Sequence, residues 1–68
     1  MGERMTREEY MALKREDMRE FRASYAMEKN NHPGGWVPAR LFFMTGAILR
    51  ELEEDGEIQS DGCGNYRP

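Results

Sequence analysis

The sequence predicts a small, mostly helical α+β domain in which a long N-terminal helix precedes one or two shorter helices and a C-terminal β-hairpin. Three observations carry this prediction. A capping signature at Thr6–Glu9 starts a stretch without helix breakers, Gly56 ends a second helical pattern, and residues 60–65 are dense in turn formers. With 68 residues the chain has room for one core, so we expect a single domain over residues 1–68.

The first helix is expected over residues 6–29. In a capping box the Thr6 hydroxyl accepts a hydrogen bond from the Glu9 amide, and the Glu9 carboxylate accepts one from the Thr6 amide. Nothing breaks the helical pattern before residues 30–35, where asparagine, proline and glycine follow one another.

Side chains of three kinds separate around this helix at about 100° per residue. The apolar stripe consists of Tyr10, Met11, Met18, Phe21 and Tyr25; a basic edge holds Arg15, Arg19 and Arg22; and acidic residues occupy the other side, at Glu9, Glu16, Asp17 and Glu20. An apolar stripe on so small a chain also allows a homodimer that would bury it.

The apolar pattern of residues 38–55 predicts either two helices, near 38–44 and 46–55, or one unbroken helix. Pro38 suits a first helical position because its missing N–H would have no partner there. Thr45 can cap a new helix, which favours the break. A shared face would hold Leu41, Phe42, Thr45, Ile48, Leu49 and Leu52, and a single helix would leave Phe43 exposed.

The last segment predicts a hairpin across residues 57–67. Residues 57–59 alternate as a strand does, the turn formers follow, and residues 66–67 return as the second strand. Since a bare hairpin is marginal in water, Ile58 and Tyr66 are expected to pack on the helices, with Trp36-Val37 available as a third strand.

The pattern Leu49-x-x-Leu52-x-x-x-Gly56-x-Ile58, with a glycine-rich turn and Tyr66 after it, resembles the end of a winged helix-turn-helix domain. The resemblance covers residues 36–67, which would form a winged-helix-like core. It implies that the two leucines seat the second helix of the motif on the core, that the glycine ends this helix, and that the hairpin is the wing.

The resemblance implies a small DNA-binding regulatory module, acting in transcription regulation, with its second motif helix in the major groove of duplex DNA. The residues expected at the groove are Thr45, Arg50, Asn65 and Arg67, and those expected near phosphates are Arg15, Arg19 and Arg22.

A net charge of −3 favours a different function, because neutralising phosphates requires cations. The alternative is an acidic adaptor or inhibitor that binds a partner protein through an apolar and acidic surface. Its expected contact residues are Phe43, Met44 and the acidic helix end at Glu54.

Catalytic and metal chemistry is not expected. The chain has one histidine and one cysteine, so it holds no zinc ligand set, and no motif indicates an enzyme, a cofactor or a small-molecule substrate. No apolar run approaches the length of a membrane span, the first six residues contain no signal-peptide pattern, and Cys63 is alone. These features predict a cytoplasmic protein.

Overall fold

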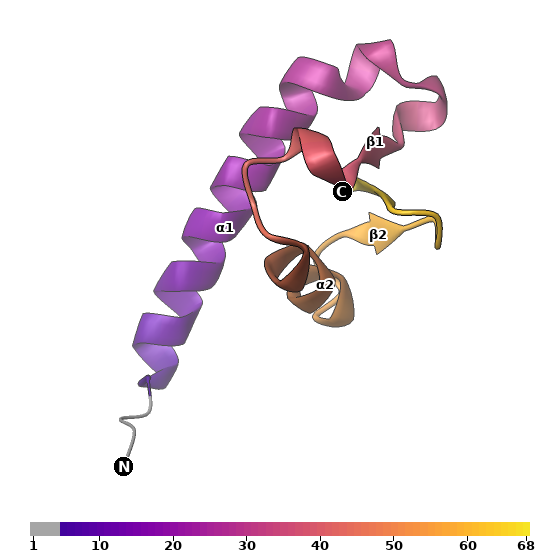
Figure 1. Cartoon of the computed structure of the whole chain (residues 1–68). Helices are drawn as coiled ribbons and strands as arrows, with labels where there is room; N and C mark the ends of the chain where they lie inside the picture. Colours follow the sequence, from indigo (N-terminus) through magenta and orange to yellow (C-terminus); the bar gives the residue numbers. More distant parts are fainter. Residues whose placement is uncertain (1–4) are drawn as a thin grey trace.

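The computed structural model describes residues 5–68 and consists of one long helix, one short helix and a small antiparallel sheet (Figure 1). The α-helices are α1 (Arg7–Glu28) and α2 (Gly46–Glu54), and the strands are β1 (Val37–Pro38), β2 (Gln59–Ser60) and β3 (Asn65–Arg67). Three single turns of 3₁₀ helix connect them: η1 (Lys29–Asn31), η2 (Pro33–Gly35) and η3 (Ala39–Leu41). The predicted small, mostly helical fold with a long N-terminal helix is confirmed.

The capping box at the start of α1 is present as predicted. The Thr6 amide donates to Glu9 Oε1 at 2.8 Å, and the Glu9 amide donates to Thr6 Oγ1 at 3.1 Å. Two backbone donors that have no partner inside the helix are thereby satisfied, which fixes where α1 begins.

The chain reverses after α1 through two glycines in the left-handed region. Gly34 has a φ of 72° and Gly35 a φ of 76°, which side chains with a Cβ rarely adopt. At Gly35 there is also no space, because a Cβ would lie 2.5 Å from the Tyr25 hydroxyl. The turn therefore lies beside Tyr25 near the C-terminal end of α1, and the chain continues into β1.

α2 matches the helix predicted near 46–55. The Thr45 hydroxyl accepts from the Ile48 amide at 3.2 Å and caps its start. Gly56, with a φ of 79°, follows its C-cap as predicted.

The helix expected over residues 38–44, with Pro38 at its first position, is wrong, and so is one unbroken helix over 38–55. Pro38 is extended and belongs to β1. Within residues 38–45 only η3 is helical. The cause is pairing with the hairpin, since the Ala39 amide donates to the Gly64 carbonyl at 2.9 Å. The expected helix-turn-helix motif is therefore reduced to a 3₁₀ turn followed by α2.

The three strands form a sheet in the order β1-β3-β2, with both pairs antiparallel. Tyr66 on β3 lies opposite Val37 on one side and Ser60 on the other. The predicted hairpin and the third strand from Val37 are thus confirmed, although Trp36 itself precedes β1.

The core lies where α1, α2 and the sheet meet. Its buried members are Met18, Phe21, Val37, Phe42, Leu49, Leu52 and Ile58. Phe21 of α1 stacks on Phe42 with ring centroids 4.5 Å apart, so the segment that is not helical still delivers its apolar side chain to the core.

α1 is longer than the core that it covers. The molecule measures 45 × 21 × 18 Å, and the N-terminal half of α1 extends away from the rest of the fold (Figure 1). Met18 and Phe21 are buried, whereas Tyr10 and Met11 of the same predicted stripe are exposed. Among residues 5–68, no helix is both long and apolar enough to cross a membrane.

Candidate functional site

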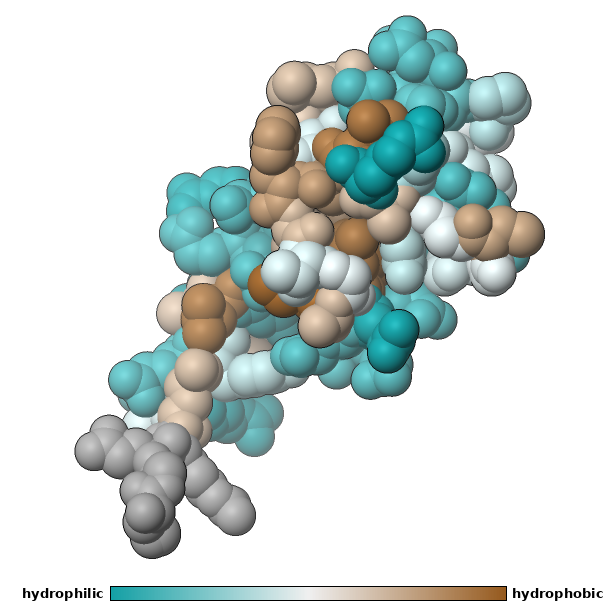
Figure 2. Space-filling view, viewed as in Figure 1, coloured by the Kyte–Doolittle hydropathy of each residue, from teal (hydrophilic) through white to brown (hydrophobic). Residues whose placement is uncertain are grey.

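Exposed apolar side chains gather on the projecting half of α1. Met5 is 50% exposed and Leu13 is 48% exposed, and Tyr10 and Met11 lie between them in the sequence. Figure 2 shows apolar side chains continuing along this half of the helix, beyond the main body of the molecule. So much exposed apolar surface at one end of a small protein is typical of a contact site.

Two adjoining hollows that share Met5 and Leu13 run along this end of the molecule, and we call them together the acidic groove. Its apolar residues are Met5, Tyr10, Ala12, Leu13, Ile48 and Leu52, and its charged residues are Glu9, Lys14, Glu16, Asp17, Glu51 and Asp55. One hollow has a wall from α1 and a wall from α2. The other is lined by Met5 and by α1 alone.

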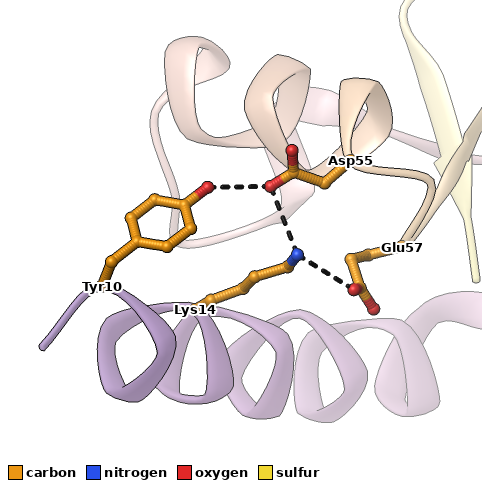
Figure 3. A network of polar contacts seen from close by, with 4 residues as sticks. All are labelled: Tyr10, Lys14, Asp55 and Glu57. Carbon is orange, nitrogen blue, oxygen red and sulfur yellow. Dashed lines mark hydrogen bonds and ion pairs between the residues drawn. The ribbon is translucent and has the colours of Figure 1, made fainter. Parts of the chain in front are cut away.

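A polar network joins the two walls (Figure 3). The Tyr10 hydroxyl donates to Asp55 Oδ2 at 2.9 Å, and Lys14 Nζ lies 3.4 Å from Asp55 Oδ2 and 3.1 Å from Glu57 Oε2. The hydrogen bond to Asp55 raises the pKa of Tyr10. The contact with Glu57, followed by the contacts with Asp55, raises the pKa of Lys14, although its burial opposes the shift. The network holds the projecting helix against the end of α2.

The rim of the acidic groove carries negative charge that this network does not neutralise. Lys14 is the one cation that lines the groove among residues 5–68, and Asp55 and Glu57 already engage it. Glu16 pairs with Arg19, while Asp17 and Glu51 form no ion pair with any residue that the structure describes. Glu9 accepts the Thr6 amide, which lowers its pKa and keeps it ionised.

A second groove lies along α1 and adjoins the acidic groove at Ala12, Lys14 and Glu16, and we call it the basic groove. It is lined by Met11, Ala12, Lys14, Arg15, Glu16, Met18, Arg19, Arg22 and Glu57. The structure therefore brings together Arg15, Arg19 and Arg22, the three residues expected near phosphates. Of these, Arg19 is paired with Glu16, and the hydrogen bond to Glu16 raises the pKa of Arg19.

The four residues expected at a DNA groove do not line the basic groove, and three of them bond within the chain. Thr45 caps α2, and Asn65 Nδ2 donates to Asp61 Oδ2 at 2.7 Å. Arg67 has its guanidinium 4.2 Å from the centre of a Trp36 ring. It also donates to Gln59 and to the Gly34 carbonyl. Arg50 is exposed on the outer face of α2.

The residues expected to bind a partner protein also lie outside both grooves. Phe43 is 84% exposed, Glu54 is exposed in the last turn of α2, and Met44 is half-buried against the core. The sequence did hold a signal for the acidic groove: Leu13 is an apolar residue on the acidic side of the predicted helix, outside the stripe.

Within residues 5–68 no group of three or more histidine, cysteine, aspartate or glutamate side chains is placed to hold a metal ion. The two grooves offer an apolar surface and charged side chains. Comparison of the chain with protein-family models, with curated proteins and with solved structures found no match.

Proposed function

We propose that this chain is a protein-binding adaptor or inhibitor and that it docks its partner in the acidic groove. The observation that carries this proposal is the exposure of Met5 and Leu13 beside Ile48 and Leu52, in one hollow between α1 and α2. Burying such surface on a partner releases about 25 cal/mol for each Å² of apolar area removed from water. The polar rim is typical of a protein interface.

The outer face of α2 favours a protein partner over DNA. Arg50 is exposed there beside Glu53 and Glu54, so the face that would enter a DNA groove is negative overall. Carboxylates at this position repel phosphates, whereas a protein surface can supply matching cations.

The test is partner capture from cells by the full chain and by two charge-matched variants. Leu13→Arg places a charge in the acidic groove, and Met27→Arg makes the same change at a 70% exposed position of α1 that lines none of the grooves. We expect a protein that co-purifies with the wild type and with Met27→Arg, and that is lost with Leu13→Arg. A partner that tolerates Leu13→Arg but is released by Phe43→Ala would contradict the groove as the site.

A second candidate function is a winged-helix DNA-binding regulatory module, and the basic groove favours it. Arg15, Arg19 and Arg22 lie along one helix edge, at a spacing that suits successive phosphate contacts. This candidate would use the hairpin that follows α2 as its wing, with β1 beside β3. Duplex binding that falls with salt is the test of this candidate.

A further inference from the structure

We infer that the occupant of the acidic groove is a basic amphipathic helix, with apolar side chains along one stripe and lysine or arginine on the flanks. This inference rests on the proposed function and adds the chemistry of the partner. Three features of the groove carry it: its two helical walls, its length, and the charge of its rim.

The walls suit a third helix. Tyr10 and Leu13 come from α1, and Ile48 and Leu52 come from α2, so one hollow of the groove lies between two helices. A helix in such a groove places side chains at i, i+3, i+4 and i+7 against both walls. From Arg7, where α1 begins just after Met5, to Asp17 the helix rises about 15 Å at 1.5 Å per residue, which a partner helix of about 10 residues would cover.

The rim determines which helix fits. Asp17 and Glu51 stand on opposite walls without an ion pair to any residue in 5–68, and Glu9 is held ionised at the projecting end. Charges on both sides of an apolar floor select cations on both flanks of the bound helix. Lys14 does not offset this, because Asp55 and Glu57 engage it.

A second copy of this chain fits the groove less well. The projecting half of its α1 would bring the same carboxylates, Glu9 and Glu16, beside the same apolar residue, Leu13. Like charges would then face one another across the contact, which is unfavourable.

The experiment uses three labelled peptides of 14 residues and the full chain, with fluorescence anisotropy as the readout. The first peptide carries a leucine stripe at helical spacing with lysine flanks; the second replaces each lysine by glutamate; the third keeps the first composition and breaks the helical spacing. We expect the lysine peptide to bind about tenfold or more tightly than either of the others at low salt, with a smaller difference at high salt.

Variants locate the binding. Leu13→Arg should weaken the affinity for the lysine peptide by about tenfold or more, and Met27→Arg should leave that affinity unchanged. The double variant Asp17→Asn with Glu51→Gln should reduce the difference in affinity between the lysine and glutamate peptides. Circular dichroism checks that each variant is folded.

The inference would be overturned by equal affinity for the lysine and glutamate peptides, or by no binding of any peptide. It would also be overturned if Leu13→Arg left the affinity for the lysine peptide unchanged, or if the wild type formed a dimer that Leu13→Arg dissociates. The proposed function fails separately, through partner capture. A cellular partner that needs Leu13 but docks through an acidic or extended segment would overturn the inference and leave the proposed function in place.

Discussion

Tyr10 connects the projecting half of α1 to the end of α2 through one hydrogen bond to Asp55. That bond raises the pKa of Tyr10, and removing its acceptor with Asp55→Ala should lower the pKa toward the ordinary value near 10. A titration of the Tyr10 ring by NMR in both proteins measures the change. The same pKa in wild type and variant would show that the contact does not form in solution.

The same network predicts how stability depends on pH at the alkaline end. Folding raises the pKa of Tyr10, through Asp55, and that of Lys14, through Glu57. A raised pKa means that the folded state holds the proton more tightly than the unfolded chain does. The stabilisation is therefore complete below the unfolded pKa values, near 10, and is lost as pH rises through the folded ones. Urea denaturation across pH 9–12 should show this loss in the wild type and a smaller loss in Asp55→Asn with Glu57→Gln.

Leu52 and Leu13 provide a matched pair for the core and the groove. Leu52 is 3% exposed, so Leu52→Ala should lower the free energy of unfolding by ~2–5 kcal/mol, the range for cavities left in a core. Leu13 is 48% exposed, so Leu13→Ala should change it by about 0.5 kcal/mol. Thermal melts of both variants check this; equal losses would mean that Leu13 is part of the core.

Contacts between residues near in sequence could be predicted, and so could the pairing of Val37 with the hairpin, whereas the side-chain contacts between other distant residues could not. The Thr6–Glu9 box and the Thr45 cap follow from spacing alone, because both bonds span three residues. The guanidinium of Arg67, one of the expected DNA contacts, lies over the Trp36 ring, and only the pairing of β3 with β1 brings these two residues together. Periodicity identifies faces of a helix and does not show which long-range partner a face meets.

The start of α2 depends on a side chain that was also a candidate DNA contact. Thr45→Ala removes the hydroxyl that accepts from the Ile48 amide and should cost ~1 kcal/mol of stability, whereas Thr45→Ser should retain most of it. Chemical denaturation measures both. A folded Thr45→Ala protein of unchanged stability would show that the cap contributes nothing and leave the hydroxyl available for a ligand.

Two glycines at element ends should respond oppositely to alanine. Gly46 is the first residue of α2 and an added Cβ would meet nothing within 4 Å, so Gly46→Ala should stabilise by about 0.4–1 kcal/mol. Gly35→Ala should destabilise, because its φ is +76° and its Cβ would lie 2.5 Å from the Tyr25 hydroxyl. Melting temperatures that move the same way in both would contradict the turn geometry.

The segment before α2 shows why a helical pattern can be misleading. Leu41 and Phe42 continue the apolar face of α2, so their spacing predicted a helix. Both do pack on the core, but from a 3₁₀ turn and an extended residue. The hydrogen bond from Ala39 to Gly64 outweighs local propensity, and no local pattern reports it.

The molecule as a whole separates its charges across α1. One hollow of the acidic groove reaches α2 and the basic groove reaches Glu57, and the two grooves share Ala12, Lys14 and Glu16. α1, at 22 residues, is about 33 Å long, which exceeds what so small a core can cover. Its exposed half is thus the part of the described chain most able to meet a partner.

The backbone amides of this half of α1 should exchange with solvent faster than those around Met18. They should gain protection when the partner binds. Hydrogen exchange with and without the captured partner measures this, and protection confined to the hairpin would contradict the groove.

Duplex binding separates the two candidate functions. With a net charge of −3 and a negative outer face on α2, the chain should show no binding to mixed-sequence duplexes at physiological salt. Binding at low salt would shift support to the basic groove, and each of Arg15→Ala and Arg22→Ala should then flatten the salt dependence by about one phosphate contact. Arg50→Ala should cost ~1–3 kcal/mol only if that side chain reads a base edge, because phosphate contacts carry no sequence preference. Fluorescence anisotropy at two salt concentrations distinguishes these outcomes. If binding at low salt is unchanged in Arg15→Ala and Arg22→Ala but is lost in Arg50→Ala, then α2 contacts the DNA despite its carboxylates, and the adaptor proposal fails.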